Sequence, residues 1–264
     1  MWVQRSLQPY PEARFTPSDG KDAASPQPAP RQNRLLAALP PEDYERLLPN
    51  LEPVALPLGW NVHPAGDRVK HLYFPTAGIV SRLHVTKLGE TAAVAITGRE
   101  GVVGIASFLG GESTSSEAVV LIAGHAYRVR ANLLKDEFEH GKPLSHLLLR
   151  YAGALIVQIV QIAACYRHHS VEQQLCQWIL SSLDRVRSNE LAMTQELIAD
   201  MLGVRREGIT EAAGKLQEAG LIRYRRGHIA VPDRSQLELK ACECYAVVKR
   251  EHDLLLGEDG SPAH

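Results

Sequence analysis

Arginine, glutamate and threonine side chains are concentrated between positions 205 and 211, where their types and spacing match the chemistry of base-pair recognition. An arginine can donate two hydrogen bonds to the O6 and N7 atoms of guanine, and a glutamate can accept one from the N4 amino group of cytosine. Arg206 and Glu207 are adjacent, so this pair has the groups to recognise a G·C pair and its neighbour. Thr210 and Glu211 follow one helical turn later and extend the same set.

Two short helices are expected to present these side chains. The first begins after Thr194, a good N-cap residue, and ends at Gly203, because glycine readily adopts the left-handed conformation that closes a helix. The second runs from about Arg205 to about Ala219. Two short helices joined by so tight a turn predict a helix-turn-helix, in which the amino-terminal end of the second helix enters the major groove of DNA.

The residues after the second helix predict a basic β-hairpin, or wing, with its turn at Arg225-Arg226-Gly227. Six basic and three acidic residues give positions 203–231 a net charge of +3, although the whole chain carries −1. This segment is therefore the local basic patch that contact with DNA phosphates requires. An ordinary helical hairpin with solvated arginines is the structural alternative. The residues expected to contact DNA are Thr194, Arg205, Arg206, Glu207, Thr210, Glu211, Lys215, Arg225 and Arg226.

Short apolar runs separated by glycine, proline, aspartate or asparagine fill the chain between Leu51 and Arg130. This rhythm predicts the short strands of an antiparallel barrel or roll. Helical patterns flank the region, so the expected fold class is α+β. The strands are expected at 54–58, 71–74, 79–85, 92–96, 119–122 and 126–129, and the flanking helices at 34–36, 41–48, 132–138 and 171–186.

A long helix is predicted from Pro143 to about Tyr166. The stretch from Tyr151 to Cys165 carries no charged side chain, and it is too short to span a bilayer. A helix that is apolar on all sides must be covered on all sides, and a second copy of the same helix is the simplest additional cover. A homodimer is therefore expected, with a heptad seam formed by Leu148, Tyr151, Leu155, Gln158 and Ile162.

The four cysteines lack the paired spacing of zinc ligands, so no metal site is expected among them. Cys242 and Cys244 stand two apart in a helical pattern, which would point their side chains in different directions. His168 and His169 interrupt the apolar run between two predicted helices and are interpreted as a solvated junction. The absence of an apolar signal segment and of a disulfide framework favours a cytoplasmic protein without a membrane partner.

The order of a β-roll, a long helix, a junction, a helix-turn-helix and a wing resembles the Crp/Fnr family of bacterial regulators over Arg34 to Arg234. The most specific stretch is TQELIADMLGVRRE, from Thr194 to Glu207. The resemblance implies a transcription factor whose Arg206 and Glu207 contact G·C pairs of a near-palindromic site in double-stranded DNA. RNA polymerase is a further implied partner. Glu211 departs from the family pattern, which has a second base-reading arginine there, so a different half-site is expected.

The sensor half departs further from the members of this family that bind cyclic AMP. They use a glutamate to hold the ribose and an arginine to hold the phosphate, and Val102 and Ser116 occupy those places here. Because each lost charge-assisted bond costs about 1.5–3 kcal/mol, no tight cyclic-nucleotide binding is expected. An iron–sulfur cluster is not expected without amino-terminal cysteines, nor is haem at His63, His71 or His84. The candidate effector pocket comprises Gly101, Val102, Val103, Gly104, Ser115 and Ser116.

The expected domain organisation follows from these elements. It comprises a disordered arm at 1–32, a cyclic-nucleotide-binding-like β-roll at 33–142, a dimerisation helix at 143–166, a winged helix at 167–240 and a carboxyl-terminal extension at 241–264. No nucleophile–base set, phosphate loop or metal spacing indicates an enzyme, and no catalytic residue is assigned. The functional alternative is a ligand-sensing or protein-interaction module that keeps the fold without reading DNA sequence.

Overall fold

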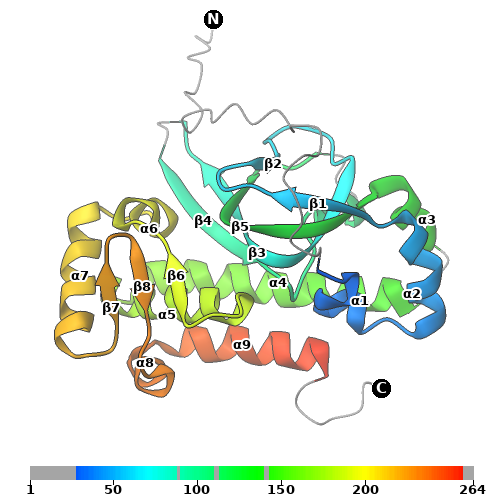
Figure 1. Cartoon of the computed structure of the whole chain (residues 1–264). Coiled ribbons are helices and arrows are strands. Elements are labelled where there is room, and N and C mark those ends of the chain that lie inside the picture. Colours follow the sequence, from blue (N-terminus) through cyan, green and yellow to red (C-terminus); the bar gives the residue numbers. More distant parts are fainter. Residues whose placement is uncertain (1–27, 88–89, 110–112, 140–142, 258–264) are drawn as a thin grey trace, which may run out of the picture.

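The computed structural model describes residues 28–87, 90–109, 113–139 and 143–257. A β-roll lies above a long helix, a helical domain with a small sheet lies at one end of that helix, and the last helix of the described chain runs along the side away from the β-roll (Figure 1). The described residues therefore confirm the predicted α+β class.

Regular structure is present in part of the segment expected to be a disordered arm. Residues 30–32, assigned to a disordered arm, form a 3-10 helix, η1 (Pro30–Gln32), while residues 1–27 lie outside the described part. Asn33 explains the order, because its buried side chain accepts a hydrogen bond from Leu36 N and donates to the carbonyl oxygens of Pro75 and Gly101. The following short helices are α1 (Arg34–Ala37), α2 (Pro41–Leu47) and η2 (Leu48–Asn50).

The β-roll is an antiparallel sheet of order β1-β5-β3-β4, with β2 also paired to β5. Its elements are β1 (Glu52–Leu56), β2 (Asn61–His63), β3 (His71–Val85), β4 (Thr91–Thr97), η3 (Ile105–Phe108) and β5 (Glu117–Arg130).

The separate strands expected at 71–74 and 79–85 are one strand, β3, and those at 119–122 and 126–129 are one strand, β5. The glycines taken for turns lie at irregularities within this pair. Gly78 has a φ of +86°, and a Cβ on Gly124 would lie 2.1 Å from the Ala77 carbonyl oxygen. The register shifts there because these glycines allow a bulge and close backbone approach.

Helix α3 (Ala131–Glu139) leads to α4 (Pro143–His168), which runs beneath the sheet (Figure 1). By length and composition α4 is long and apolar enough to cross a membrane, because the helix extends beyond the uncharged stretch from Tyr151 to Cys165 that was judged too short. Core helices of soluble proteins meet the same criterion, and one side of α4 is buried against the β-roll.

Ser170 separates α4 from α5 (Val171–Arg185) and caps α5 through a capping box with Gln173. The rest of the chain forms the helical domain and its three-stranded sheet, of order β6-β8-β7. The elements are β6 (Glu190–Ala192), α6 (Gln195–Leu202), α7 (Arg206–Glu218), β7 (Arg223–Arg225), β8 (His228–Ala230), α8 (Arg234–Lys240) and α9 (Glu243–Leu256). Strand β6 was not expected, because a run of three residues is too short to show a period in the sequence.

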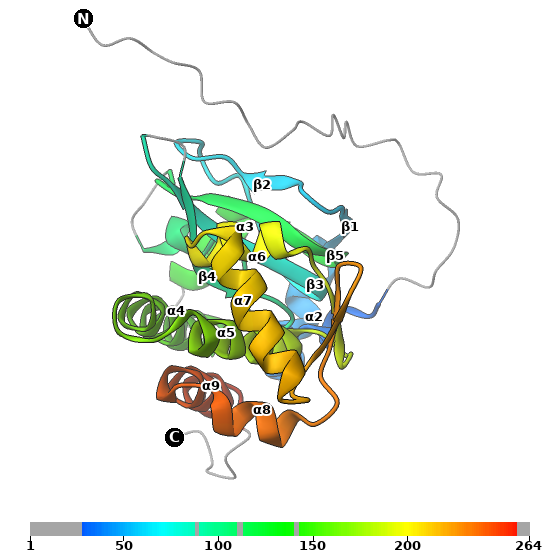
Figure 2. The ribbon, with the colours of Figure 1, turned by 90° about the vertical axis from the view of Figure 1, so that its left-hand side faces the viewer.

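The helical domain packs directly on the β-roll. One hydrophobic core contains residues of both parts, including Leu83 of β3, Trp178 of α5 and Ile198 of α6. The Tyr166 hydroxyl of α4 lies 3.2 Å from the Ala93 carbonyl oxygen in β4 and 3.0 Å from that of Met201 in α6. This packing leaves α7 at the outer end of the molecule, where it lies in front in Figure 2.

Candidate nucleic-acid interface

Local signals fix the two helices of the helix-turn-helix as the sequence predicts. The Thr194 hydroxyl accepts a hydrogen bond from Leu197 N at 3.2 Å and so caps α6. Gly203 ends α6 with a φ of +64°, a conformation that favours glycine. Helix α7 begins at Arg206, with Arg205 as its N-cap residue.

One face of α7 is buried and the other is open to solvent. The inward side chains are Ile209, Ala212, Ala213 and Leu216. Every predicted DNA-contacting residue in or next to this helix is exposed: Arg205, Arg206, Glu207, Thr210, Glu211 and Lys215. The Thr210 hydroxyl is 2.8 Å from Gln195 Oε1, so the exposed face is tied to the first turn of α6.

Glu211, the departure from the family pattern, does not stand alone on this face. Its Oε1 atom lies 2.7 Å from Lys215 Nζ, and this ion pair lowers the pKa of Glu211. Both side chains are exposed, so the pair contributes little to stability. Its consequence is electrostatic, because the lysine offsets the negative charge that Glu211 would bring toward DNA.

The wing is a hairpin closed by a two-residue turn at Arg226 and Gly227. Both have positive φ angles, +50° and +78°, as a type I′ turn requires. Gly227 also accepts a hydrogen bond from Met193 N at 2.7 Å, which fixes the turn beside the start of α6. Arg225, expected in the turn, is the last residue of β7, and both arginines are exposed.

The predicted dimer seam was wrong. Leu148, Tyr151, Leu155, Gln158 and Ile162 are all buried within the chain itself, so they cannot meet a second copy. The Tyr151 hydroxyl lies 3.1 Å from Thr97 Oγ1. With the Gln158 side-chain amide in the orientation that pairs its oxygen with a donor, this oxygen accepts a hydrogen bond from Arg185 Nη2 at 2.9 Å. The heptad spacing of these residues therefore reflects packing of α4 on the β-roll within one chain, not a contact between two chains.

A second heptad row on α4 remains exposed. Leu149, Ile156 and Val160 have exposed fractions of 50%, 57% and 57%. Gly153 and Ala163 complete the alternating three- and four-residue steps and are also exposed. This row, which we call the α4 stripe, is apolar, and its two small residues would allow the close approach of another helix.

The six residues of the candidate effector pocket do not lie around one cavity. Val102 and Val103 are core residues, and a Cβ on Gly101 would lie 2.5 Å from the Tyr151 ring. Ser115 is exposed. Gly104 and Ser116 line a small cavity in the β-roll; its other lining residues are His63, Val69, Arg82, Ala106, Thr114, Glu117 and Ala118.

Arg82 is a pocket residue that the sequence analysis missed. It reaches the cavity from β3, and its Nη1 atom lies 3.4 Å from the Ser116 hydroxyl, at the place where an arginine was judged absent. Burial and the charge of Arg82 lower the pKa of His63 to about 4, so this histidine is neutral at pH 7. The cavity has a volume of about 10 Å³, room for about one water molecule.

The cysteines are arranged differently from the expectation. Cys165, Cys242 and Cys244 are buried together, and His169 joins them, with all four potential ligand atoms within 4.8 Å of one another. The side chains therefore lie together in space although their spacing along the chain lacks the pairing of zinc ligands. Cys242 is not part of the helix but its extended N-cap residue, so its side chain and that of Cys244 converge.

Two family models match the chain at the two parts whose geometry is described above. The model of the Crp-like helix-turn-helix domain matches residues 173–239, and that of the cyclic nucleotide-binding domain matches residues 55–140. The chain belongs to the Crp/Fnr family of transcriptional regulators. Helix α7 and the wing of this Crp/Fnr regulator both fall within the first match, and the cavity beside Arg82 falls within the second.

Relatives and solved structures agree with this assignment. The Crp/Fnr regulator is 23% identical over 176 residues to the global nitrogen regulator of Synechococcus elongatus, which covers 63% of this chain and 79% of that protein. Its fold is similar to that of FixK2 from Bradyrhizobium japonicum, with a TM-score of 0.64 and 15% identity over 73% of this chain and 98% of that one. The fold is also similar to that of a putative transcriptional regulator of the Crp/Fnr family from Eubacterium rectale. The TM-score is 0.62 and the sequence identity is 17%, over 79% of this chain and 98% of that one.

Proposed function

We propose that this Crp/Fnr regulator binds a near-palindromic site in double-stranded DNA as a homodimer in the cytoplasm. The observation that carries the proposal is the joint exposure of Arg206 and Glu207 on α7 and of Arg225 and Arg226 at the wing. The first pair has the groups that distinguish a G·C pair, and the second has charges for the flanking phosphates. RNA polymerase is a further proposed partner, on family grounds alone.

The α4 stripe is the surface we assign to the second copy. It is apolar, follows a heptad spacing and lies on a helix whose opposite side is already buried in the chain. A two-fold pairing of such helices gives a self-complementary interface. It would also present two copies of α7 to two half-sites, which DNA geometry places about one helical turn apart.

We further propose that DNA binding does not depend on cyclic AMP. A cavity of about 10 Å³ has no room for a nucleotide. Val102, at the place where a ribose-binding carboxylate would stand, is buried in the core. Arg82 supplies one cation to the cavity wall, but its side chain is directed to Ser116. Neither an iron–sulfur cluster nor haem is part of the proposal.

Selection of binding sites from a random duplex library tests this function. We expect purified protein without added ligand to enrich a two-fold-symmetric motif, and Arg206→Ala to lose preference at one G·C pair at a cost of about 1–3 kcal/mol. Arg250→Ala is the matched control, because Arg250 is an exposed arginine on α9.

Two other outcomes of the selection would contradict different parts of the proposal. Enrichment only after cell extract is added would show that an effector is needed and overturn the ligand-independent part of the proposal. No enrichment under either condition would favour the alternative of an interaction module that does not read DNA.

A further inference from the structure

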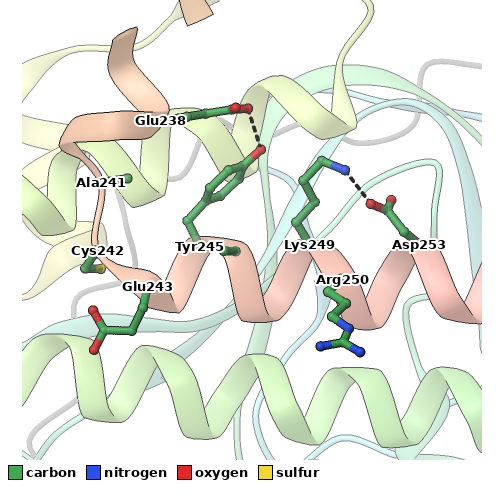
Figure 3. A pocket seen from close by; sticks show the side chains of 9 residues that line it. Glu238, Ala241, Cys242, Glu243, Tyr245, Lys249, Arg250 and Asp253 are labelled. Carbon is green, nitrogen blue, oxygen red and sulfur yellow. Dashed lines mark hydrogen bonds and ion pairs between the residues drawn. The ribbon is translucent and has the colours of Figure 1, made fainter. Parts of the chain in front are cut away.

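Four side chains with metal-binding atoms meet where three helices of the molecule join. Cys165 lies near the end of α4 and His169 just beyond it, next to the Ser170 cap of α5. Cys242 is the N-cap residue of α9 and Cys244 lies in its first turn. Figure 3 shows Cys242 at the start of α9, beside Glu243. The cluster therefore connects segments that are more than seventy residues apart in sequence.

Two distances between these atoms match a tetrahedral site, and all four atoms lie within 4.8 Å of one another. Cys165 Sγ lies 3.6 Å from Cys242 Sγ, and Cys244 Sγ lies 3.6 Å from His169 Nδ1. A zinc ion with Zn–S bonds of about 2.3 Å and Zn–N bonds of about 2.0 Å would hold two sulfurs about 3.8 Å apart and a sulfur and a nitrogen about 3.5 Å apart. Any pair that lies farther apart, up to the 4.8 Å that bounds the cluster, would have to close around the ion.

The surroundings of the cluster also suit metal ligation. His169 Nε2 lies 3.3 Å from Glu243 Oε1, so a carboxylate would orient the imidazole from behind, as is usual for metal-bound histidines. The three cysteines are nearly inaccessible, with exposed fractions of 0%, 5% and 2%, and a buried thiolate group of this kind needs a counter-charge.

A disulfide explains less of this arrangement. A bond between Cys165 and Cys242 would have to bring the sulfurs from 3.6 Å to about 2.0 Å. It would leave Cys244 and the oriented His169 without a role. Cys176, the remaining cysteine, is also buried but does not belong to the cluster.

We propose that Cys165, His169, Cys242 and Cys244 bind one divalent metal ion of the zinc class in a closed, structural site. The ion would fasten the start of α9 to the α4–α5 junction, which joins the β-roll to the DNA-binding half. The site does not depend on the proposed DNA recognition, and its test is independent of it.

Elemental analysis of the full-length protein, expressed in zinc-supplemented medium and purified without a metal-affinity step, tests this site. We expect about one zinc per chain. Cobalt added to reduced, metal-free protein should give the visible bands of tetrahedral Co²⁺ and near-ultraviolet bands of thiolate-to-metal charge transfer. Cys244→Ser and His169→Asn should each reduce both signals strongly, whereas Cys176→Ser should keep them. Glu243→Gln should weaken binding about 10- to 100-fold.

The wild-type measurements decide the matter even if a variant fails to fold. Four reactive thiols with no zinc and no cobalt spectrum would overturn the proposal. A mass two hydrogens below that of the reduced chain, with no metal bound, would replace it with a disulfide, and iron with acid-labile sulfide would replace it with a cluster. Equal loss of metal in folded Cys176→Ser and Cys244→Ser would show that the cluster residues are not the ligands.

Discussion

The Arg185 guanidinium forms a buried ion pair with the Glu100 carboxylate, with 2.8 Å between Nε and Oε1. Arg185 is the last residue of α5, and Glu100 lies in the loop after β4, so the pair joins the helical domain to the β-roll. Burial alone would raise the pKa of Glu100, but Arg185 holds it below its usual value. Nε2 of His252, in α9, lies 3.5 Å from Nη2 of Arg185. Three segments thus meet at one cation.

Removing the carboxylate should be costly. Glu100→Gln leaves the Arg185 charge buried without its partner, and we expect the free energy of unfolding to fall by about 3–5 kcal/mol. Urea unfolding followed by circular dichroism measures this change. The pair formed by Glu52 and Arg128 is mostly exposed, so Glu52→Gln should cost less than about 1 kcal/mol. Equal losses in the two variants would contradict the role given to Glu100.

The protein should lose stability in mild acid because of His252. Burial and the neighbouring Arg185 lower the pKa of His252 to about 4, from 6.5 in an unfolded chain. Between these values the unfolded state binds more protons than the folded state, so the free energy of unfolding decreases as the pH falls through this interval. The difference in pKa corresponds to about 3 kcal/mol from this group.

Urea unfolding at a series of pH values checks this effect. His252→Gln should reduce the loss between pH 6.5 and 4 by about that amount, whereas His168→Gln, at an exposed position, should leave the profile unchanged. The pKa of His63 is also lowered to about 4, so His63 too reduces the free energy of unfolding as the pH falls. The His252→Gln variant should therefore retain part of the pH dependence. A profile identical to that of the wild type would show that His252 does not titrate as described.

The wing should contribute to affinity through charge rather than sequence. Arg226→Asn removes one cation but suits the type I′ turn, in which Asn-Gly is favoured. We expect weaker binding to all duplexes and a decrease of about 0.9 in the slope of log affinity against log salt. Fluorescence anisotropy at several salt concentrations measures this slope. Arg250→Asn on α9 is the control, and an unchanged slope in Arg226→Asn would remove the wing from the interface.

The α4 stripe should control association of the chain. Ile156→Arg places a charge on a side chain that is 57% exposed, and arginine is a good helix former, so the fold should be retained. We expect the variant to sediment as a monomer at concentrations at which the wild type is a dimer. Leu58→Arg, at a position 60% exposed outside α4, should remain dimeric. A dimeric Ile156→Arg variant would place the interface elsewhere.

The helix-turn-helix half could be predicted because its signals are local. The Thr194 cap, the left-handed Gly203 and the Arg226-Gly227 turn each act within a few residues, so short stretches of sequence specify the helices and the hairpin. The exposure of Arg206 and Glu207 then follows from the apolar residues on the other side of α7.

Only the tertiary structure decided which surface of α4 is free and which distant side chains meet. A helix that is apolar on all sides has two heptad rows, and packing on the β-roll buries the one with Tyr151 and leaves the one with Ile156. The contacts of Arg82 with Ser116 and of Cys165 with Cys242 join residues 34 and 77 positions apart. The spacing of residues along the chain does not predict such pairs, because strand register and helix packing determine how far apart the two side chains lie.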